Sequence, residues 1–156
     1  MESIVSILDK WSIESEKLLK EKYISRGQKA SGKFGDSLRH DLTNTSTTIL
    51  GAKQIDMMMS GRKPNAKQDD DSLPKWVGWA GSTFLADWVK DKGLSINSYA
   101  VAWGIAREGV KVPNQHNDGK LLNEVFTPEH LNSLISQIGR FYATEITSNI
   151  KKAWLQ

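Results

Sequence analysis

The chain has 156 residues, of which 38% are hydrophobic and 25% are charged, and its formal net charge is only +3. This length predicts one domain, and so small a basic excess does not indicate a nucleic-acid binder, because such proteins cluster their charge on one face. The lack of cysteine excludes disulfides and thiolate metal sites. No segment approaches the roughly 20 consecutive apolar residues of a membrane span, and the first residues lack the basic lead-in of a signal peptide, so we expect no membrane association.

A long amphipathic helix is predicted over residues 3–23. Its apolar residues recur at steps of three and four, which is the helical period. Ser3 is suited to cap the start of this helix, and Lys20 and Lys22 suit the negative end of its dipole. The apolar stripe consists of Ile4, Ile7, Leu8, Trp11, Leu18 and Leu19, with Ser15 on the same side.

A small antiparallel sheet is expected after this helix. Residues 25–35 are polar and glycine-rich, which favours a loop. Alternating apolar and polar residues, followed by β-branched ones, then predict strands at 36–43 and 46–53 with a turn at Thr43-Asn44-Thr45. A third short piece, extended or helical, covers residues 55–59.

A sharp corner is predicted at Gly61, because glycine permits backbone conformations closed to other residues. Arg62 and Lys63 follow it as a basic pair. Such a pair can contact a phosphate backbone or a neighbour's carboxylate, and two solvated charges in a turn explain it equally well.

An acidic linker, residues 65–71, separates the hairpin part of the single domain from its helical part. Asp69, Asp70 and Asp71 repel one another and are expected to stay solvated. Negative charge is also favourable immediately before a helix start. Calcium loops alternate their ligands around a central glycine, so this run is not predicted to bind a cation.

Two middle helices are expected next. The first is capped by Ser72, carries apolar residues as far as Val89 and is ended by Gly93, and the second begins at Ser95 or Asn97 and is ended by Gly109. Trp76, Trp88 and Trp103 fall at core spacing in these helices. Trp79 lies three residues after Trp76 on a second face, so it is our candidate for a subunit contact, because exposed Trp is enriched in interface hot spots.

The last helix is predicted to start after Thr127, with Pro128 as its first residue, and to run to the chain end. It follows a polar, extended loop, VPNQHNDGK. The predicted fold class is therefore α+β: a small antiparallel sheet packed by long N-terminal and C-terminal helices, plus two middle helices.

No catalytic or cofactor site is predicted. His40, His116 and His130 lack partners at metal-ligand spacing, and the segments SGKFG and SGRKP lack the Gly-x4-Gly-Lys-Ser/Thr frame of a phosphate loop. No Ser-His-acid, Cys-His or paired-carboxylate set is evident. We therefore expect a protein that is not an enzyme and that holds no cofactor or metal.

Four short motifs occur in order along the chain. They are Ala30-Ser31-Gly32-Lys33-Phe34-Gly35-Asp36-Ser37-Leu38, Met59-Ser60-Gly61-Arg62-Lys63-Pro64, Asp87-Trp88-Val89-Lys90-Asp91-Lys92-Gly93-Leu94 and Ala102-Trp103-Gly104-Ile105-Ala106-Arg107-Glu108-Gly109-Val110. Their order and spacing resemble the tail-completion and head–tail joining proteins of tailed bacteriophages, and related minor tail proteins. Two features depart from that pattern: methionines occupy 57–59, where a tyrosine is expected, and an acidic insert precedes the Trp-rich helix.

The resemblance implies a structural virion protein that forms a homo-oligomeric ring at the head–tail interface or at the tail end, as a tail-completion or connector component. Its expected partners are portal or adaptor proteins and tail proteins of the same virion, with possible non-specific contact with packaged DNA. Its expected location is the virion, assembled in the host bacterial cytoplasm. Rings need heterologous contacts, and Arg62–Lys63 with Asp69–Asp71 offer oppositely charged surfaces for one.

The alternative hypothesis is a small nucleic-acid-binding module. It would use Arg26, Lys29, Lys33, Arg39, Arg62 and Lys63, and a steep salt dependence of DNA affinity would distinguish it. An enzyme or toxin-like factor is a third possibility, for which no site is found. The polar segments 26–35 and 111–126 are expected to become ordered only through partners.

Overall fold

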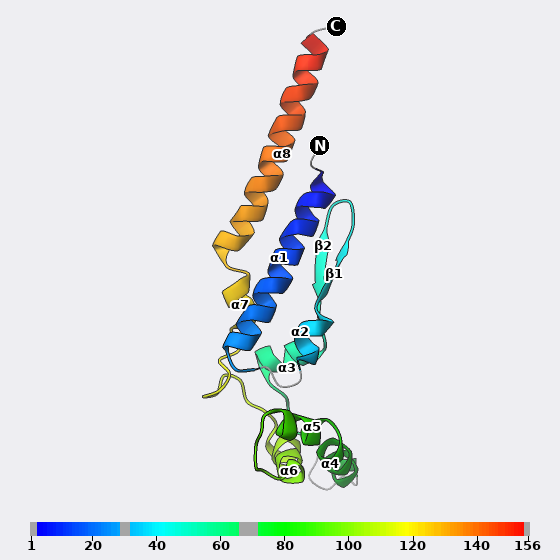
Figure 1. The fold of residues 1–156 in the computed structure, drawn as a ribbon, viewed down its shortest axis with the longest axis vertical. Helices are drawn as coiled ribbons and strands as arrows, with labels where there is room; N and C mark the ends of the chain where they lie inside the picture. Colours follow the sequence, from blue (N-terminus) through cyan, green and yellow to red (C-terminus); the bar gives the residue numbers. More distant parts are fainter. Residues whose placement is uncertain (1–2, 29–31, 66–71, 155–156) are drawn as a thin grey trace.

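The computed structural model describes residues 3–28, 32–65 and 72–154 (Figure 1). The fold is α+β, as predicted, with one two-stranded antiparallel sheet among the described residues. In chain order the elements are α1 (Ile4–Ser25), α2 (Lys33–Ser37), β1 (Arg39–Leu42), β2 (Thr47–Leu50), α3 (Gln54–Ser60), α4 (Ser72–Ser82), α5 (Phe84–Asp91), α6 (Ser98–Glu108), α7 (Leu121–Val125) and α8 (Pro128–Trp154).

Helix α1 is the element around which the first half of the fold is built. The Ser3 side chain accepts a hydrogen bond from the Ser6 N–H at 3.1 Å, so the predicted cap is confirmed. The hairpin lies along one side of α1, while α7 and the first turns of α8 lie along another (Figure 1). One core cluster forms where α1 meets α2 and α7, and its buried members are Leu19, Tyr23, Phe34, Leu121 and Val125.

The hairpin is attached to α1 by polar side chains. Its strands pair in the register Arg39 opposite Leu50, and they are shorter than predicted. His40 bridges two carboxylates of α1: its Nδ1 lies 2.6 Å from Glu16 Oε1, and its Nε2 lies 2.9 Å from Asp9 Oδ1. A ring that donates to two carboxylates carries both protons. The hydrogen bonds that His40 makes to Asp9 and then to Glu16 accordingly raise its pKa above 6.5.

A clasp of side chains joins the first turn of α8 to the middle of α1. The rings of Trp11 and His130 stack with centroids 4.9 Å apart, and the indole N–H donates to the His130 carbonyl at 3.2 Å. Ser15 is fully buried, and its Oγ lies 2.8 Å from His130 Nε2. Because Ser15 is small, it leaves space for the His130 ring on the apolar stripe of α1. Thr127 Oγ1 accepts from the His130 N–H at 3.3 Å, which confirms the predicted start of α8.

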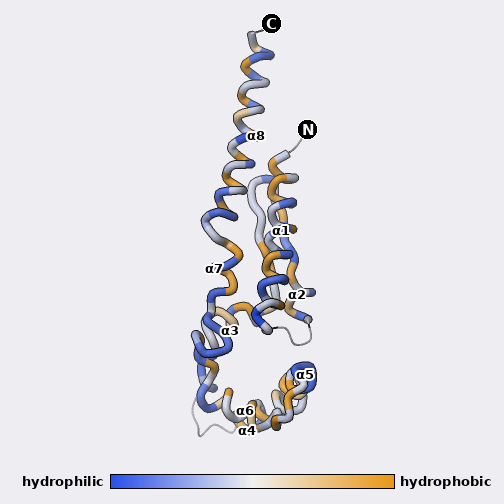
Figure 2. The backbone as a smooth tube through the Cα atoms, turned by 60° about the vertical axis from the view of Figure 1, so that its left-hand side comes forward, coloured by the Kyte–Doolittle hydropathy of each residue, from blue (hydrophilic) through white to orange (hydrophobic). Residues whose placement is uncertain are grey.

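The position of this clasp leaves most of α8 beyond the body of the chain. Only seven residues, or about 10 Å at 1.5 Å per residue, separate Trp11 from the start of α1 at Ile4. From His130 to Trp154 the antiparallel α8 runs 24 residues, or about 36 Å. Its distal half therefore extends alone past α1 (Figures 1 and 2), and α8 has no fully buried residue.

Three helices, α4 to α6, form a separate unit at the opposite end of the chain (Figure 1). Its core consists of Leu73, Val77, Ala80, Leu85, Ala102 and Ala106, with Trp76, Val101 and Ile105 packed against it. Asn97 caps α6 by accepting from the Tyr99 N–H at 2.8 Å, and Gly109 ends it, as predicted. Trp88 is half-buried, whereas Trp103 is 41% exposed, so the prediction that Trp103 belongs to the core is wrong.

The prediction of one helix from residue 73 to Val89 is also wrong, because α4 and α5 are separated at Thr83. Ser82 Oγ donates to the Gly78 carbonyl at 2.7 Å, and Thr83 Oγ1 donates to the Trp79 carbonyl at 2.6 Å. Hydroxyls that bond a carbonyl one turn back compete with the backbone ladder and favour a helix end. The break folds α5 back onto α6, so the unit has three middle helices rather than two.

Two glycines define the crossing between the two units. Gly61 (φ +77°, ψ −163°) and Gly109 (φ +74°, ψ −164°) share a conformation that only glycine adopts readily. They flank an isolated antiparallel bridge in which Arg62 and Val110 exchange backbone hydrogen bonds of 2.8 and 2.7 Å. A Cβ at Gly61 would overlap the Val110 carbonyl oxygen, and one at Gly109 would overlap the Arg62 carbonyl oxygen. The predicted corner at Gly61 is confirmed.

We predict that Gly61→Ala and Gly109→Ala each lower the free energy of unfolding by more than about 2 kcal/mol, because backbone strain of about 1–3 kcal/mol adds to a backbone clash. Gly93→Ala is the matched control. Gly93 has φ +62° but no atom within 4 Å of its added Cβ, so only the strain applies. Urea unfolding measures all three, and equal losses at the three positions would contradict this reading of the crossing.

We predict that His40→Gln destabilises the chain by about 1–3 kcal/mol at pH 6, since it removes two charge-assisted hydrogen bonds. The pKa of His40 is raised in the folded state, so its contribution is fully present below the unfolded value near 6.5 and is lost as pH rises through the folded pKa. The melting temperature of the wild type should therefore fall across that range more steeply than that of His40→Gln. His116→Gln, in an exposed turn, is the control and should leave the slope unchanged.

Candidate interaction surfaces

The described residues include no candidate metal site. No group of three or more His, Asp or Glu side chains in that part of the chain is placed to hold an ion. No helix there is long and apolar enough to cross a bilayer. The most prominent features of the described residues are exposed apolar surfaces and one network of ion pairs around Arg26.

The basic corner is only partly free to meet a partner. The Arg62 guanidinium lies 4.1 Å from the centroid of the Trp76 ring, and its Nη2 donates to Asn65 Oδ1 at 2.5 Å. Burial lowers the pKa of Arg62 below its usual value, although a guanidinium remains charged. Arg62 is therefore used inside the chain, and Lys63, which is exposed, carries the outward charge of the corner.

The acidic half of the predicted charge pair, Asp69, Asp70 and Asp71, lies outside the described residues. Their contact with Arg62–Lys63 across subunits therefore stays a prediction. Lys29 of the alternative nucleic-acid reading also lies outside the described residues.

Aromatic side chains gather on the surface of the α4–α6 unit. Trp79 is 58% exposed, as predicted for a contact residue, and its ring centroid lies 5.4 Å from that of Phe84. Tyr99 covers Gly81, where an added Cβ would meet the Tyr99 ring. Four aromatic side chains of the unit, which we call together the aromatic surface, are each more than 40% exposed: Trp79 and Phe84, whose rings are neighbours, and Tyr99 and Trp103, which lie one turn apart on α6. Large exposed aromatics on a small helical unit are typical of a protein-binding surface.

A second apolar surface follows α8. Leu131, Ile135, Tyr142, Ile146, Ile150 and Trp154 are all exposed. Half-buried residues of the helix, such as Leu134, Ile138 and Phe141, lie about one quarter-turn away from these exposed ones. Figure 2 shows apolar positions recurring to the end of α8, where no other segment lies beside it. Sequence analysis identified these residues as helical but not as a surface, because periodicity does not reveal which side a neighbour covers.

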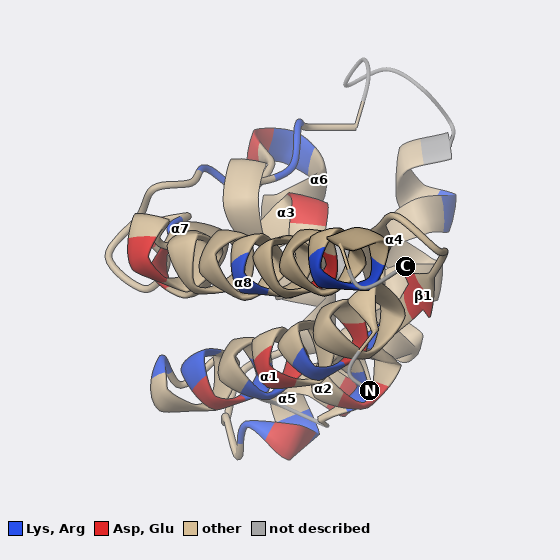
Figure 3. Cartoon of the chain, turned by 90° about the horizontal axis from the view of Figure 1, so that it is seen from above, with Lys and Arg blue, Asp and Glu red and all other residues tan. Residues whose placement is uncertain are grey.

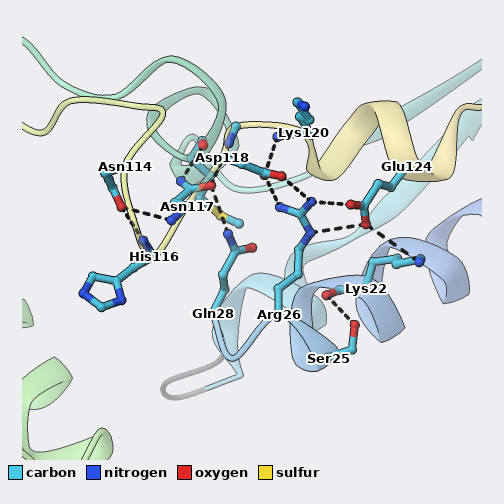
Figure 4. Close-up of polar contacts among 12 residues, drawn as sticks. Lys22, Ser25, Arg26, Gln28, Asn114, His116, Asn117, Asp118, Lys120 and Glu124 are labelled. Carbon is cyan, nitrogen blue, oxygen red and sulfur yellow. Dashed lines mark hydrogen bonds and ion pairs between the residues drawn. The ribbon is translucent and has the colours of Figure 1, made fainter.

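The polar segment after α6 is held by Arg26, at the end of α1 (Figure 4). The guanidinium donates to both carboxylate oxygens of Asp118, at 2.5 and 3.2 Å, and to both of Glu124, at 3.3 and 2.5 Å. Its side chain is only 17% exposed. The expectation that residues 111–126 become ordered only through partners is therefore wrong. They are fixed within the chain, and part of them forms α7.

These ion pairs shift the pKa values of all three groups. Hydrogen bonds from Arg26, and then from the Lys120 N–H, lower the pKa of Asp118 to about 2. Hydrogen bonds from Arg26 also lower the pKa of Glu124, and the two carboxylates raise that of Arg26. Both carboxylates are partly exposed, so solvent and salt weaken the network.

Comparisons of the chain with protein-family models, with curated proteins and with solved structures found no match.

We predict that Arg26→Met lowers the melting temperature at pH 7 by several degrees, because it leaves two neighbouring carboxylates to repel each other. Depressed carboxylate pKa values contribute stability above the unfolded values near 4, and this contribution is lost as pH falls toward 2. The variant should therefore lose less stability than the wild type between pH 5 and pH 2. Lys20→Met, which removes one exposed ion pair with Asp36 at 3.0 Å, is the control. Similar acid limbs for Arg26→Met and wild type would contradict the role of the network.

Proposed function

We propose that this chain is a structural virion protein of a tailed phage, which forms a homo-oligomeric ring at the head–tail interface or at the tail end. The observation that carries the proposal is the aromatic surface on the α4–α6 unit, at one end of an elongated chain. A surface displaced from the body of a subunit is suited to a heterologous contact with a different patch on the next copy, which is what a ring requires. The order of motifs from Ala30 to Val110 supports the virion assignment by resemblance.

In this proposal Trp79 and its aromatic neighbours supply the apolar part of the subunit contact. Lys63 and the acidic linker at Asp69–Asp71 supply the charged part. Portal or adaptor proteins and tail proteins of the same virion are the proposed neighbours of the ring, and packaged DNA is a non-specific contact at most.

The alternative, a small nucleic-acid-binding module, has less support. Two of its six basic residues are occupied inside the chain: Arg26 by Asp118 and Glu124, and Arg62 by Trp76. Lysines and arginines also alternate with acidic residues along α1 instead of forming a basic stripe (Figure 3). Phosphate binding favours charges of one sign on one face.

We predict closed rings in negative-stain electron microscopy of the purified full chain, and a matching high-mass species in native mass spectrometry. Trp79→Ser should reduce the ring population at least tenfold, since it removes the most exposed side chain of the aromatic surface. Lys75→Ser, in the same exposed helix, is the control. Reversal of Asp69, Asp70 and Asp71 to lysine should also weaken assembly, and more so at low salt.

DNA binding separates the two readings. A structural ring predicts weak affinity with a shallow salt dependence, whereas several phosphate contacts predict a loss of 10³-fold or more between about 50 and 200 mM salt. A chain that forms no rings and binds DNA with that steep slope is the nucleic-acid module, and the virion proposal is then wrong.

A further inference from the structure

The β1–β2 hairpin depends on α1 for its stability. A hairpin of two strands is at best marginally stable in water by itself, and in the described part of the chain these two strands form a sheet of their own. Three side chains, which we call the hairpin latch, join it to α1: His40 of β1, and Asp9 and Glu16, about two turns apart on α1. The charge state of the latch therefore bears on whether the hairpin stays in place (Figure 1).

The geometry of the latch fits one protonation state of His40. Ionised carboxylates accept hydrogen bonds but cannot donate them, so both ring nitrogens must carry a proton to bond Glu16 at 2.6 Å and Asp9 at 2.9 Å. A neutral imidazole has one N–H and one lone pair. Loss of the proton therefore leaves a lone pair facing an anionic oxygen, and one of the two attachments becomes repulsive.

The other charged groups near the latch are directed elsewhere. Strand β2 (Thr47–Leu50), which pairs with β1, has no titratable side chain. Arg39 and Asp41 flank the histidine in β1, but they are exposed and project to the opposite side of the strand, because successive residues alternate. Lys20, one turn further along α1, is bonded to Asp36 of α2 at 3.0 Å. The charge that lies between the two carboxylates of the latch is thus that of the histidine.

Burial makes the neutral latch costly in the closed position. The side chains of His40 and Glu16 are only 16% and 22% exposed, whereas that of Asp9 is 44% exposed. A carboxylate with so little access to water costs free energy when its partner no longer compensates the charge. Opening of the hairpin returns water to Glu16, so a neutral ring favours the open hairpin.

The direction of the pH effect follows from the pKa of His40, which its hydrogen bonds to Asp9 and then to Glu16 raise above 6.5. A raised pKa in the closed state means that the latch contributes fully below the ordinary value near 6.5. Its contribution is lost as pH rises through the higher, closed-state pKa.

The second histidine on α1 is bonded in a way that does not depend on its charge. Ser15 Oγ donates its proton to the Trp11 carbonyl at 2.8 Å, so its oxygen accepts from His130 Nε2. That one N–H is present in both the neutral and the charged ring. The Trp11–His130 clasp therefore holds α8 on α1 in either state, and it serves as an internal control for the hairpin.

We propose that the hairpin latch is a pH switch, which holds the β1–β2 hairpin against α1 while His40 is protonated and releases it when the ring loses its proton, with α8 remaining in place. Release uncovers the side of α1 that carries Asp9 and Glu16. The switch goes beyond the proposed virion function, because it operates within a single chain and requires no ring, so it holds or fails independently of that proposal.

Site-resolved hydrogen exchange of the full chain tests the switch. The amides of residues 39–42 and 47–50 are compared with the Leu131 N–H, which donates to the Thr127 carbonyl at 3.0 Å at the start of α8. An unstructured peptide corrects for the intrinsic effect of pH on exchange. Between about pH 6 and about pH 9 we expect the opening equilibrium of the hairpin to rise about 10- to 100-fold, the value of one charge-assisted hydrogen bond. Leu131 should show no such step.

Asp9→Asn is the sharpest variant. A side-chain amide can accept from a charged ring and donate to a neutral one, so this latch fits both protonation states. The pH step should shrink to about fivefold or less, with the hairpin still closed at high pH, since Glu16 accepts an N–H in both states. Asp41→Asn is the matched control, because it makes the same change to an exposed carboxylate of β1 and should keep the full step.

His40→Gln separates the switch from a purely structural role of this position. Glutamine has no titrating ring and one amide group, which cannot donate from both ends to two carboxylates. The hairpin should therefore open readily at every pH, without a step. Circular dichroism and the exchange of Leu131 verify that the rest of each variant is folded.

Each outcome decides the proposal. A hairpin whose protection has no step means that Asp9 turns to solvent while the hairpin stays closed, and this overturns the switch. An equal step at Leu131 means that the whole fold opens, which also overturns it, as does a full step in Asp9→Asn. A step confined to the hairpin, lost in Asp9→Asn and His40→Gln and kept in Asp41→Asn, supports it.

Discussion

The interaction on which this structure most depends is the pairing of Arg26 with Asp118 and Glu124. These partners lie 92 and 98 residues away along the chain. The guanidinium at the end of α1 therefore holds the segment that returns from the α4–α6 unit and places α7 against the lower half of α1. Because α8 begins three residues after α7, the direction of the longest helix follows from where this network fixes the returning chain. A planar guanidinium with five donors can satisfy two carboxylates at once, which a lysine cannot.

Helix α1 is the common support of elements that hardly contact one another. The hairpin is attached to it through His40, α7 through apolar packing, and α8 through the Trp11–His130 clasp. The α4–α6 unit has a core of its own and joins the rest through the crossing of Gly61 and Gly109. An architecture with two small cores and a projecting helix leaves much apolar surface in water. Such surface is costly in a solitary monomer and useful in an assembly, where other chains cover it.

The surfaces, rather than a reactive pocket, are thus the basis of the functional proposal. The aromatic surface and the exposed apolar residues of α8 lie at opposite ends of the chain (Figure 1). Exposed apolar surface of this kind is typical of contacts with other chains. The assignment to a phage virion rests on the order of sequence motifs, and the two surfaces are consistent with it.

The sequence by itself determined the elements whose signals are local. The three- and four-residue period marked α1 and α8, the caps Ser3, Asn97 and Thr127 located helix starts, and glycine located the corner at 61 and the end of α6. Only the tertiary structure decided which sides of these elements are covered. The same period made Trp103 look like a core residue and left the bare stripe of α8 unnoticed, because periodicity defines an apolar side and not its neighbour. The break at Thr83 and the partners of Arg26 were likewise hidden. The hydroxyls of Ser82 and Thr83 that favour the break lie within an apolar pattern that continues across it, so the pattern masked them. The Arg26 pairing joins charges that meet only once the chain has folded.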